Sequence, residues 1–345
     1  MSELLKQIGE TTNNAGARLG DTILEARDLH VIFGTGVRAV DGINLKIYRG
    51  ETLGVVGESG CGKSTLGRTL CMLEAPTGGS VALNGLPISD MKGSSLREAR
   101  KSLQMVFQDP YSSLDPRQRA GEIIGEPLLL AGVDKKQRQS RVNELLDLVS
   151  IGASGYAKFP REFSGGQRQR IGIARSLAAN PEIIICDEPV SALDVSVQAQ
   201  IVNLLVSLQR KLNLTYVFIS HDLAVVRQMA DRVAVMYLGR IVELADADKI
   251  FAAPRHPYTA ALLSAVPRMP TSSAKRKPIS LPGDPPSPMH LPPGCRFQAR
   301  CWLRQKLGSP DVCSAVDPML SGTGDHQAAC HFQEHVDAQR GAQNA

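Results

Sequence analysis

The sequence has no uninterrupted apolar run near the ~18 residues that a membrane-spanning helix needs. Its first 21 residues (MSELLKQIGETTNNAGARLGD) have no long apolar core, so no secretory signal is predicted. An excess of one charge sign is also lacking, because 39 Lys and Arg face 34 Asp and Glu, for a net charge of +5. This balance permits contact with phosphates or anionic lipid headgroups but requires no nucleic acid partner. We therefore expect a protein that is cytosolic, or held to a membrane by other subunits.

The composition is that of a folded protein. Hydrophobic residues make up 43% and charged residues 21% of the 345 residues, which excludes a mostly disordered chain. This length exceeds what one hydrophobic core usually serves, so we expect a main domain with an appendage.

The first 250 residues alternate between strand and helix patterns after a loose polar lead over residues 1–21. Residues 22–48 alternate apolar and polar side chains with Gly-rich turns, which predicts antiparallel strands. Short apolar segments typical of buried strands then alternate with segments of helical periodicity. Such alternation predicts a parallel α/β sheet. We expect strands at Thr52–Val56, Ile183–Cys186 and Thr215–Ser220, and helices at Lys63–Met72, within 142–152 and 167–180, and at 196–211.

The composition changes after about residue 250. Residues 278–293 (PISLPGDPPSPMHLPP) contain seven prolines, which neither continue helices nor pair in central strands. We interpret this segment as an extended connector within an extension at 251–345. Four of the seven cysteines lie in the short part that follows it.

Residues 57–65 (GESGCGKST) fit a phosphate-binding loop between a strand and a helix. Glycines let the backbone N–H groups point at phosphate oxygens, and the helix N-terminus adds partial positive charge. Lys63 is predicted to contact the β- and γ-phosphates, and Ser64 to bind Mg²⁺. The predicted nucleotide contacts are Gly57, Glu58, Ser59, Gly60, Cys61, Gly62, Lys63, Ser64 and Thr65. We interpret Cys61 as a small spacer rather than a redox group.

Two acids end the strand that begins at Ile183. Asp187 lies where open α/β sheets bind ligands and is predicted to hold Mg²⁺, while Glu188 is predicted to act as general base on the attacking water. His221 follows the next strand and is expected to orient that water with Glu188. The alternatives are an acidic pair that only caps a strand and a structural histidine.

Ser164, Gly165, Gly166 and Gln167 begin a predicted helix and form a second anion site. One chain does not easily use both anion sites on one nucleotide, so we infer a two-cassette sandwich. The ATP of one cassette then meets Ser164 and Gly166 of the facing cassette.

With these motifs in order, residues 22–250 closely resemble the ABC ATPase family. The resemblance implies a P-loop NTPase cassette: a RecA-like parallel-sheet core, an antiparallel β subdomain, and an α-helical signature subdomain at about 109–180. It also implies ATP and Mg²⁺, with Ser64, Gln108 and Asp187 as metal ligands. By the same resemblance Phe33 stacks on adenine and Gln108 senses the γ-phosphate. Asp194, in Ser191–Asp194, lies in the dimer-interface loop. The implied catalytic residues are Glu188, His221, Gln108 and Lys63. The usual first signature residue, Leu, is Phe163 here. The alternatives are structural roles: Phe33 as a core residue, Gln108 as an ordinary polar loop residue and Asp194 as an acidic residue at a helix terminus.

Three segments narrow the resemblance to the dipeptide/oligopeptide importer ATPases, of the DppF/OppF type. They are FQDPYSSLDPRQRAGEIIGEPL (107–128), DEPVSALDVSVQAQIVNLL (187–205) and HPYTAALLSAVP (256–267). The resemblance implies an ATPase of the translocase class, peripheral on the cytoplasmic face of the membrane. Its implied partners are a second, paralogous ATPase, two integral permease subunits and, indirectly, an external solute-binding protein. Importers of nickel, glutathione or another small solute stay open, as does, less favoured, a soluble regulatory or repair ATPase.

Cys295, Cys301, Cys313 and Cys330 can close a tetrahedral Zn²⁺ site or hold a [4Fe–4S] cluster. The tail lacks the Cys-x2-Cys knuckles of zinc ribbons, and the subfamily resemblance together with the wide spacing favours the iron–sulfur cluster. Zn²⁺ and ordinary thiols remain alternatives. Because the tail has little apolar content, we expect the metal to supply the core that it lacks.

Overall fold

The computed structural model describes residues 21–34, 36–109, 111, 113–266 and 278–336. Almost all of the predicted N-terminal lead lies outside these residues. Within the described part of the chain, no helix is both long and apolar enough to cross a membrane.

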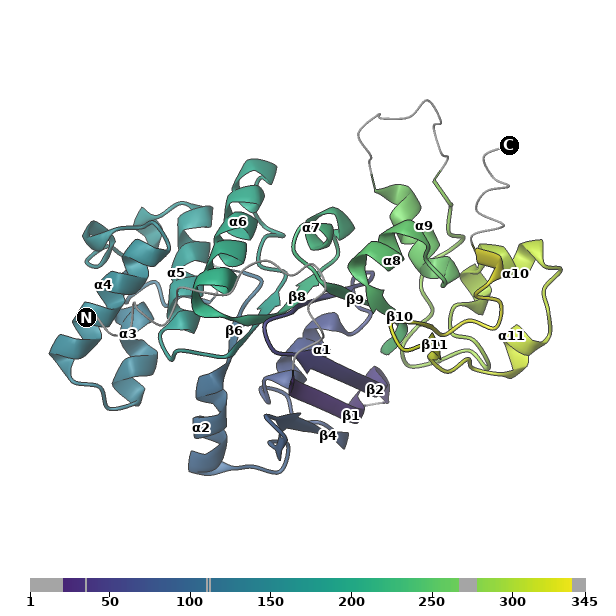
Figure 1. Ribbon diagram of the computed structural model, residues 1–345, viewed down its shortest axis with the longest axis horizontal. Helices are drawn as coiled ribbons and strands as arrows, with labels where there is room; N and C mark the ends of the chain where they lie inside the picture. Colours follow the sequence, from purple (N-terminus) through teal and green to yellow (C-terminus); the bar gives the residue numbers. More distant parts are fainter. Residues whose placement is uncertain (1–20, 35, 110, 112, 267–277, 337–345) are drawn as a thin grey trace.

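A four-stranded antiparallel sheet forms the lower part of the molecule in Figure 1. Its strands, in the order β2-β1-β4-β5, are Val37–Tyr48, Thr22–Phe33, Gly78–Leu83 and Leu86–Pro87. Buried and exposed positions alternate along much of β2, as expected for a strand with one face on the core.

The second sheet is mixed and runs through the centre of the molecule. Its order is β11-β12-β10-β9-β3-β8-β7-β6, and β9, β3, β8, β7 and β6 are parallel to one another. These five strands are Arg232–Tyr237, Thr52–Val56, Thr215–Ser220, Ile183–Asp187 and Leu103–Val106. Strands β3, β7, β8 and β9 are buried at every position, which explains their bare apolar sequences.

Helices cover the parallel strands and form a separate group at the left of Figure 1. That group contains α3 (Ala120–Leu130), α4 (Lys135–Leu148) and α5 (Gly165–Leu177). Nearer the sheets lie α1 (Lys63–Leu70), α2 (Gly93–Ser102), α6 (Val195–Leu212) and α7 (Leu223–Arg227). Helix α1 ends two residues before the predicted Met72, because Met72 adopts a left-handed conformation (φ 56°).

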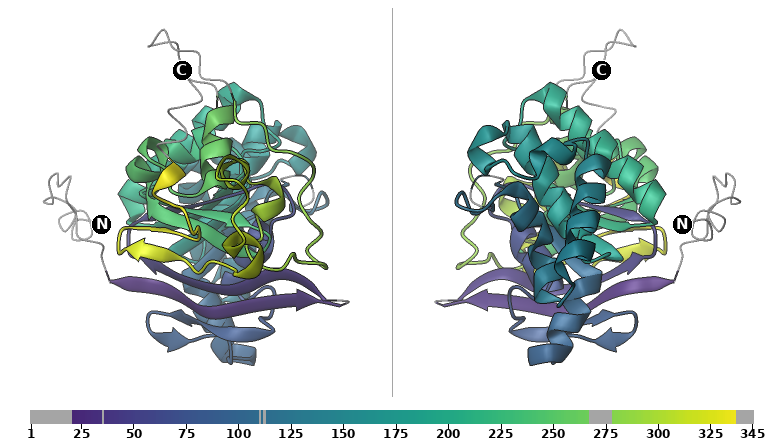
Figure 2. Two further views of the ribbon diagram at one scale, coloured as in Figure 1. Left: turned by 90° about the vertical axis from the view of Figure 1, so that its right-hand side faces the viewer. Right: turned by 90° about the vertical axis from the view of Figure 1, so that its left-hand side faces the viewer.

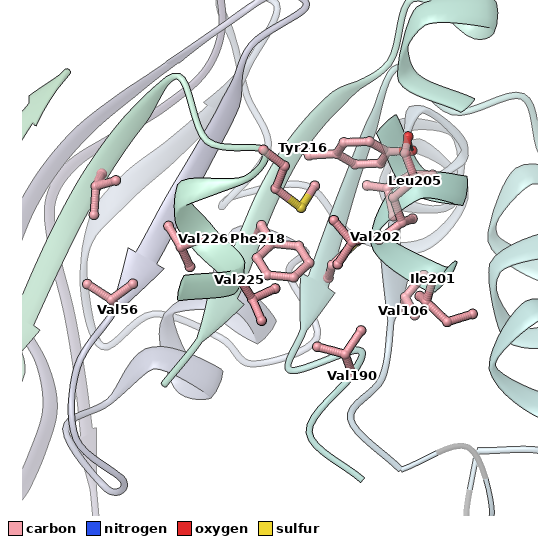
Figure 3. Packing of buried hydrophobic residues seen from close by; sticks show 14 of the residues in the cluster. Val56, Val106, Val190, Ile201, Val202, Leu205, Tyr216, Phe218, Val225 and Val226 are labelled. Atoms are coloured by element: carbon pink, nitrogen blue, oxygen red, sulfur yellow. Dashed lines mark hydrogen bonds between the residues drawn. The ribbon is translucent and has the colours of Figure 1, made fainter. Parts of the chain in front are cut away.

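The core has one layer on each face of the central sheet. In β8, Tyr216 and Phe218 face one layer while Val217 and Ile219 face the other. Figure 3 shows Val202 and Leu205 of α6 beside Tyr216 and Phe218. The Tyr216 hydroxyl donates to the Leu205 carbonyl at 3.1 Å, so the buried ring keeps its polar end satisfied.

The C-terminal extension is part of this core, so the expectation that its low apolar content leaves it without a core was wrong. Phe297, Trp302, Leu303 and Val336 are buried in the same apolar layer as α6. β12 (His326–Ala328) pairs with β10 (Arg240–Asp246) and so extends the central sheet. The end-on view in Figure 2 shows this extension against the body of the molecule. Its few apolar residues thus share the main core instead of forming a core of their own.

The remaining elements of this region are short. Residues 278–293 form no helix or strand. The others are α8 (Ala247–Ala252), α9 (Pro257–Ala265), α10 (Trp302–Lys306), α11 (Val312–Ala315), β11 (Ser321–Thr323) and a 3-10 turn at Gln298–Arg300. Two further 3-10 turns, at Ala153–Gly155 and Pro160–Glu162, connect α4 to α5.

Candidate functional site

The predicted phosphate loop connects β3 to α1. Gly62 caps α1 with φ 106°, and a Cβ there would collide with the carbonyl of Ala39. A Cβ on Gly57 would likewise collide with the carbonyl of Met236. Both glycines are therefore required by the close approach of neighbouring backbone as well as by the turn.

Lys63 is 5% exposed and folds back over this loop. Its Nζ donates to the carbonyls of Gly57 and Glu58 at 2.8 and 3.0 Å, and lies 3.9 Å from Glu188 Oε1. The ammonium group thus sits inside the curl of the loop, where a phosphate would meet it.

Ser64 and Asp187 meet although 123 residues separate them. Ser64 Oγ donates to Asp187 Oδ1 at 2.8 Å, and Asp187 is 1% exposed at the end of β7. Burial raises the pKa of Asp187, and the Ser64 hydrogen bond offsets part of that rise. A hydroxyl and a buried carboxylate are hard oxygen donors, so this pair fits Mg²⁺ chemically.

Glu188 contacts two of the other predicted catalytic residues, Gln108 and His221. Its Oε2 accepts from Gln108 Nε2 at 3.0 Å and lies 3.3 Å from His221 Nδ1. The three residues follow β6, β7 and β8, which are adjacent in the sheet, so their carboxyl ends converge at one edge. Glu188 itself adopts φ 45°, and its N–H donates to the Ile219 carbonyl at 3.0 Å. Of the three predicted Mg²⁺ ligands, Ser64 and Asp187 touch each other while Gln108 contacts Glu188.

The predicted signature begins α5. Ser164 is its N-cap, with reciprocal hydrogen bonds between Ser164 and Gln167 of 3.0 and 3.3 Å. A Cβ on Gly166 would press on Val197, and one on Gly165 would touch Leu193, so the signature lies beside the segment that carries Asp194. Asp194 is the N-cap residue of α6, without a side-chain capping bond.

Phe33 ends β1 and is 40% exposed. The alternative that it is a core residue was therefore wrong, and its ring is accessible to a planar ligand.

Comparison with known proteins shows which family the chain belongs to. Residues 40–191 match the family described as ABC transporter, and residues 242–307 match the family described as oligopeptide/dipeptide transporter, C-terminal region. The chain is 50% identical over 295 residues to the "Dipeptide transport ATP-binding protein DppF" of Escherichia coli, covering 85% of this chain and 86% of that one. It is 49% identical to the "Oligopeptide transport ATP-binding protein OppF" of Salmonella typhimurium, covering 85% and 87%. The chain belongs to the ABC transporter ATP-binding proteins.

Solved structures of ABC cassettes support the same fold. cbiO1 from Clostridium perfringens, described as part of the ABC transporter complex cbiONQ, aligns with TM-score 0.62 at 30% identity over 67% of this chain and 91% of that one. The dimeric cassette MJ0796 aligns with TM-score 0.60 at 29% identity over 65% and 99%. The expected ABC cassette fold is confirmed, and as a family member the chain is an ATPase that uses ATP and Mg²⁺.

The four tail cysteines of this ABC protein line one cavity and form no disulfide. The backbone N–H groups of Arg304 and Phe332 donate to Cys301 Sγ at 3.3 Å and Cys330 Sγ at 3.4 Å. Burial raises the pKa of the Cys295 and Cys330 thiols to about 12. In the described part of the chain, no three His, Cys, Asp or Glu side chains are arranged to hold a metal ion. Neither the [4Fe–4S] cluster nor the Zn²⁺ alternative thus gains support from this arrangement, and the matched families name no iron–sulfur centre.

Two residues at the phosphate loop escaped prediction. Tyr258 and Arg300 both contact Glu58, across 200 and 242 residues of sequence. No spacing signal links such distant positions, because the docking of the extension brings them together.

Proposed function

We propose that this ABC protein is the ATP-hydrolysing subunit of an importer for di- or oligopeptides, peripheral on the cytoplasmic face of the membrane. The names of its relatives support peptides as cargo. The contact of Gln108 and His221 with one carboxylate oxygen of Glu188 carries the hydrolytic part of the proposal.

The proposed roles follow from these contacts. Lys63 binds the β- and γ-phosphates within the loop Gly57–Thr65, and Phe33 stacks on the adenine. Glu188 takes the proton of the attacking water, while Gln108 and His221 fix the orientation of that carboxylate. Ser64 and Asp187, with Gln108, would hold Mg²⁺, which supplies charge neutralisation on the phosphates when bound.

We further propose that the cassette works as a pair with a second, paralogous ATPase. Ser164, Gly165, Gly166 and Gln167 of one subunit then complete the ATP site of the other, with Asp194 at the interface. Three arguments support a pair: α5 begins with a capped, glycine-rich anion site; its glycines lie against Leu193 and Val197 beside Asp194; and the related cassette MJ0796 is dimeric.

The proposed contact with two integral permease subunits lies at a groove of about 620 Å³. Phe107, Gln108 and Asp109 line it together with Glu126 and Pro127 of α3. Gln108 belongs both to this groove and to the Glu188 contact, so a permease helix seated there would report on the catalytic carboxylate. A solute-binding protein outside the cell would then deliver cargo to the permeases.

Purification from membranes with the neighbouring subunits, followed by uptake in reconstituted vesicles, tests the proposal. We expect the chain to co-purify with integral subunits and labelled di- or oligopeptides to enter only with ATP. Lys63→Ala should abolish uptake, while exposed Lys135→Ala should not. ATP-driven uptake of only nickel chelates or glutathione would overturn the peptide cargo. A chain that never associates with integral subunits would overturn the transport role and leave a soluble regulatory or repair ATPase.

For the tail we propose a [4Fe–4S] cluster on Cys295, Cys301, Cys313 and Cys330. Four thiols around one cavity, and N–H groups aimed at two of the sulfurs, support this ligand set. The free space between them is only about 20 Å³, so uptake of a cluster requires these side chains to move apart. Anaerobic purification should yield about four iron and four sulfide per chain, lost in Cys301→Ser and kept in Cys71→Ser. An iron-free, fully folded protein contradicts the cluster.

A further inference from the structure

Two side chains of the C-terminal extension, Tyr258 and Arg300, form hydrogen bonds with Glu58 of the phosphate loop. The Glu58 backbone N–H donates to the Tyr258 hydroxyl at 2.8 Å, and its carboxylate accepts from Arg300 Nη1 and Nη2 at 2.7 and 3.1 Å. Its carbonyl meanwhile accepts from Lys63 Nζ at 3.0 Å. Every polar group of this loop residue is thus used, two of them by the extension.

The Arg300 contact is built as a strong ion pair. It is bidentate, and the Arg300 and Glu58 side chains are 8% and 29% exposed. A planar fork on a carboxylate in a partly desolvated place is far stronger than a surface salt bridge. Trp302, two residues further on, donates to the Pro257 carbonyl at 2.9 Å and helps to hold this segment against α9.

The Glu58–Arg300 ion pair matters because Glu58 places a negative charge in a loop predicted to bind phosphates. A loop that cradles a polyanion carries a carboxylate, and the Lys63 ammonium lies against the carbonyl of the same residue. Uncompensated, that negative charge would repel the phosphates and compete for Lys63. Arg300 neutralises it from the side of the extension.

We propose that Arg300 is a positioning and charge-compensating residue for nucleotide binding: the extension supplies the cation that lets an acidic phosphate loop accept ATP. This inference rests on the proposed use of Gly57–Thr65 as the ATP phosphate site. Tyr258 assists by fixing the Glu58 backbone.

A purely structural role for Arg300, holding the extension in place, makes a different prediction. Under that role, removing the Glu58 charge from an Arg300→Ala protein brings no improvement, because the docking contact is lost in both. Under charge compensation, removing the unpaired carboxylate restores ATP binding. Arg240 is the matched control, because it ties the body to the extension through a 2.6 Å bond to Asp317 Oδ2 without reaching the loop.

The experiment measures the Kd of a fluorescent ATP analogue, and kcat and KM for ATP, on the full chain in its complex. Arg300→Ala should raise Kd and KM on the order of tenfold with a much smaller change in kcat. Arg300→Lys should lie between the two, and the Arg300→Ala penalty should shrink in high salt. Glu58→Gln alone should bind ATP at least as tightly as wild type, and Glu58→Gln with Arg300→Ala should return Kd to within about twofold of wild type.

The outcomes separate cleanly. An Arg300→Ala protein with unchanged Kd, or a double variant as weak as Arg300→Ala, overturns the inference, as does an equal penalty in Arg240→Ala. Lys63→Ala tests the underlying site: normal ATP binding in that variant overturns the phosphate site itself. Loss of binding in Lys63→Ala with normal binding in Arg300→Ala overturns only the role of Arg300. If Arg300→Ala does not fold, the same comparison is made between Arg300→Lys alone and Arg300→Lys combined with Glu58→Gln.

Discussion

The side-chain amide of Gln108 donates to the Glu188 carboxylate at 3.0 Å, although 80 residues separate the two in sequence. Gln108 also lines the groove proposed for a permease, so one side chain joins the two proposed tasks of the protein. A shift of Gln108 would leave Glu188 Oε2 with His221, while Lys63 Nζ lies 3.9 Å from the other carboxylate oxygen. We propose that Gln108 is the side chain through which movement of a permease subunit affects ATP hydrolysis.

The first prediction concerns the proposed base. Glu188→Gln keeps the size of the side chain but removes its proton-accepting charge, so kcat should fall about 10²–10⁴-fold. ATP binding should persist, and the ATP-bound pair should accumulate in its closed form. ATPase assays and size-exclusion chromatography with ATP measure both effects. Glu144→Gln, on the exposed face of α4, is the control, and normal turnover in Glu188→Gln would refute the assigned base.

The second prediction concerns Mg²⁺. Asp187→Asn and Ser64→Ala should each raise the Mg²⁺ concentration for half-maximal ATPase activity at least about tenfold, because each removes an oxygen ligand or its charge. The double variant should be little worse than either, since the two side chains form one unit. Unchanged Mg²⁺ titrations in both single variants would remove this pair from the metal site.

Asp187 also gives this titration a pH dependence. Burial raises its pKa above that of an ordinary aspartate, so protons compete with Mg²⁺ at a higher pH than usual. Apparent Mg²⁺ affinity should therefore weaken as pH falls toward that raised value, and the weakening should be absent in Asp187→Asn.

The sequence signals for the predicted nucleotide site are local, and the structure brings the residues that carry them close together. The loop 57–65 is one continuous motif, and Gln108, Glu188 and His221 each follow an apolar strand whose end fixes their edge of the sheet. The contact of Arg300 with Glu58 and the packing of Phe297 into the main core had no such signal. Both arise from docking between distant segments, which alternation and spacing do not encode.

The third prediction tests that docking. Phe297 is 1% exposed and packs edge-on against Tyr237, with ring centroids 5.2 Å apart, and against Tyr258 at 5.4 Å. Phe297→Ala should therefore lower the free energy of unfolding of the whole protein by about 3–5 kcal/mol. Met319→Ala, 73% exposed in the same extension, should change it by less than about 0.5 kcal/mol. A separate, early unfolding step for the tail, with the main transition unchanged, would contradict a shared core.

The fourth prediction concerns His256, which caps α9 by accepting from the Tyr258 N–H at 3.1 Å. Burial lowers its pKa from 6.5 to about 3, so the folded protein keeps the ring neutral. Between these values the unfolded chain binds a proton that the folded chain does not, and stability must fall as pH falls. The loss is about 1.4 kcal/mol per pH unit below 6.5.

Denaturant unfolding at pH 7.5 and 5 measures this loss directly. His256→Asn retains a side-chain acceptor at the cap but does not titrate, so it should be less stable than wild type at pH 7.5 yet lose about 2 kcal/mol less on acidification. Exposed His290→Asn should follow the wild-type pH dependence. Other carboxylates titrate in both proteins and cancel in the comparison, so equal pH dependence in wild type and His256→Asn would mean that the ring is protonated in the folded state.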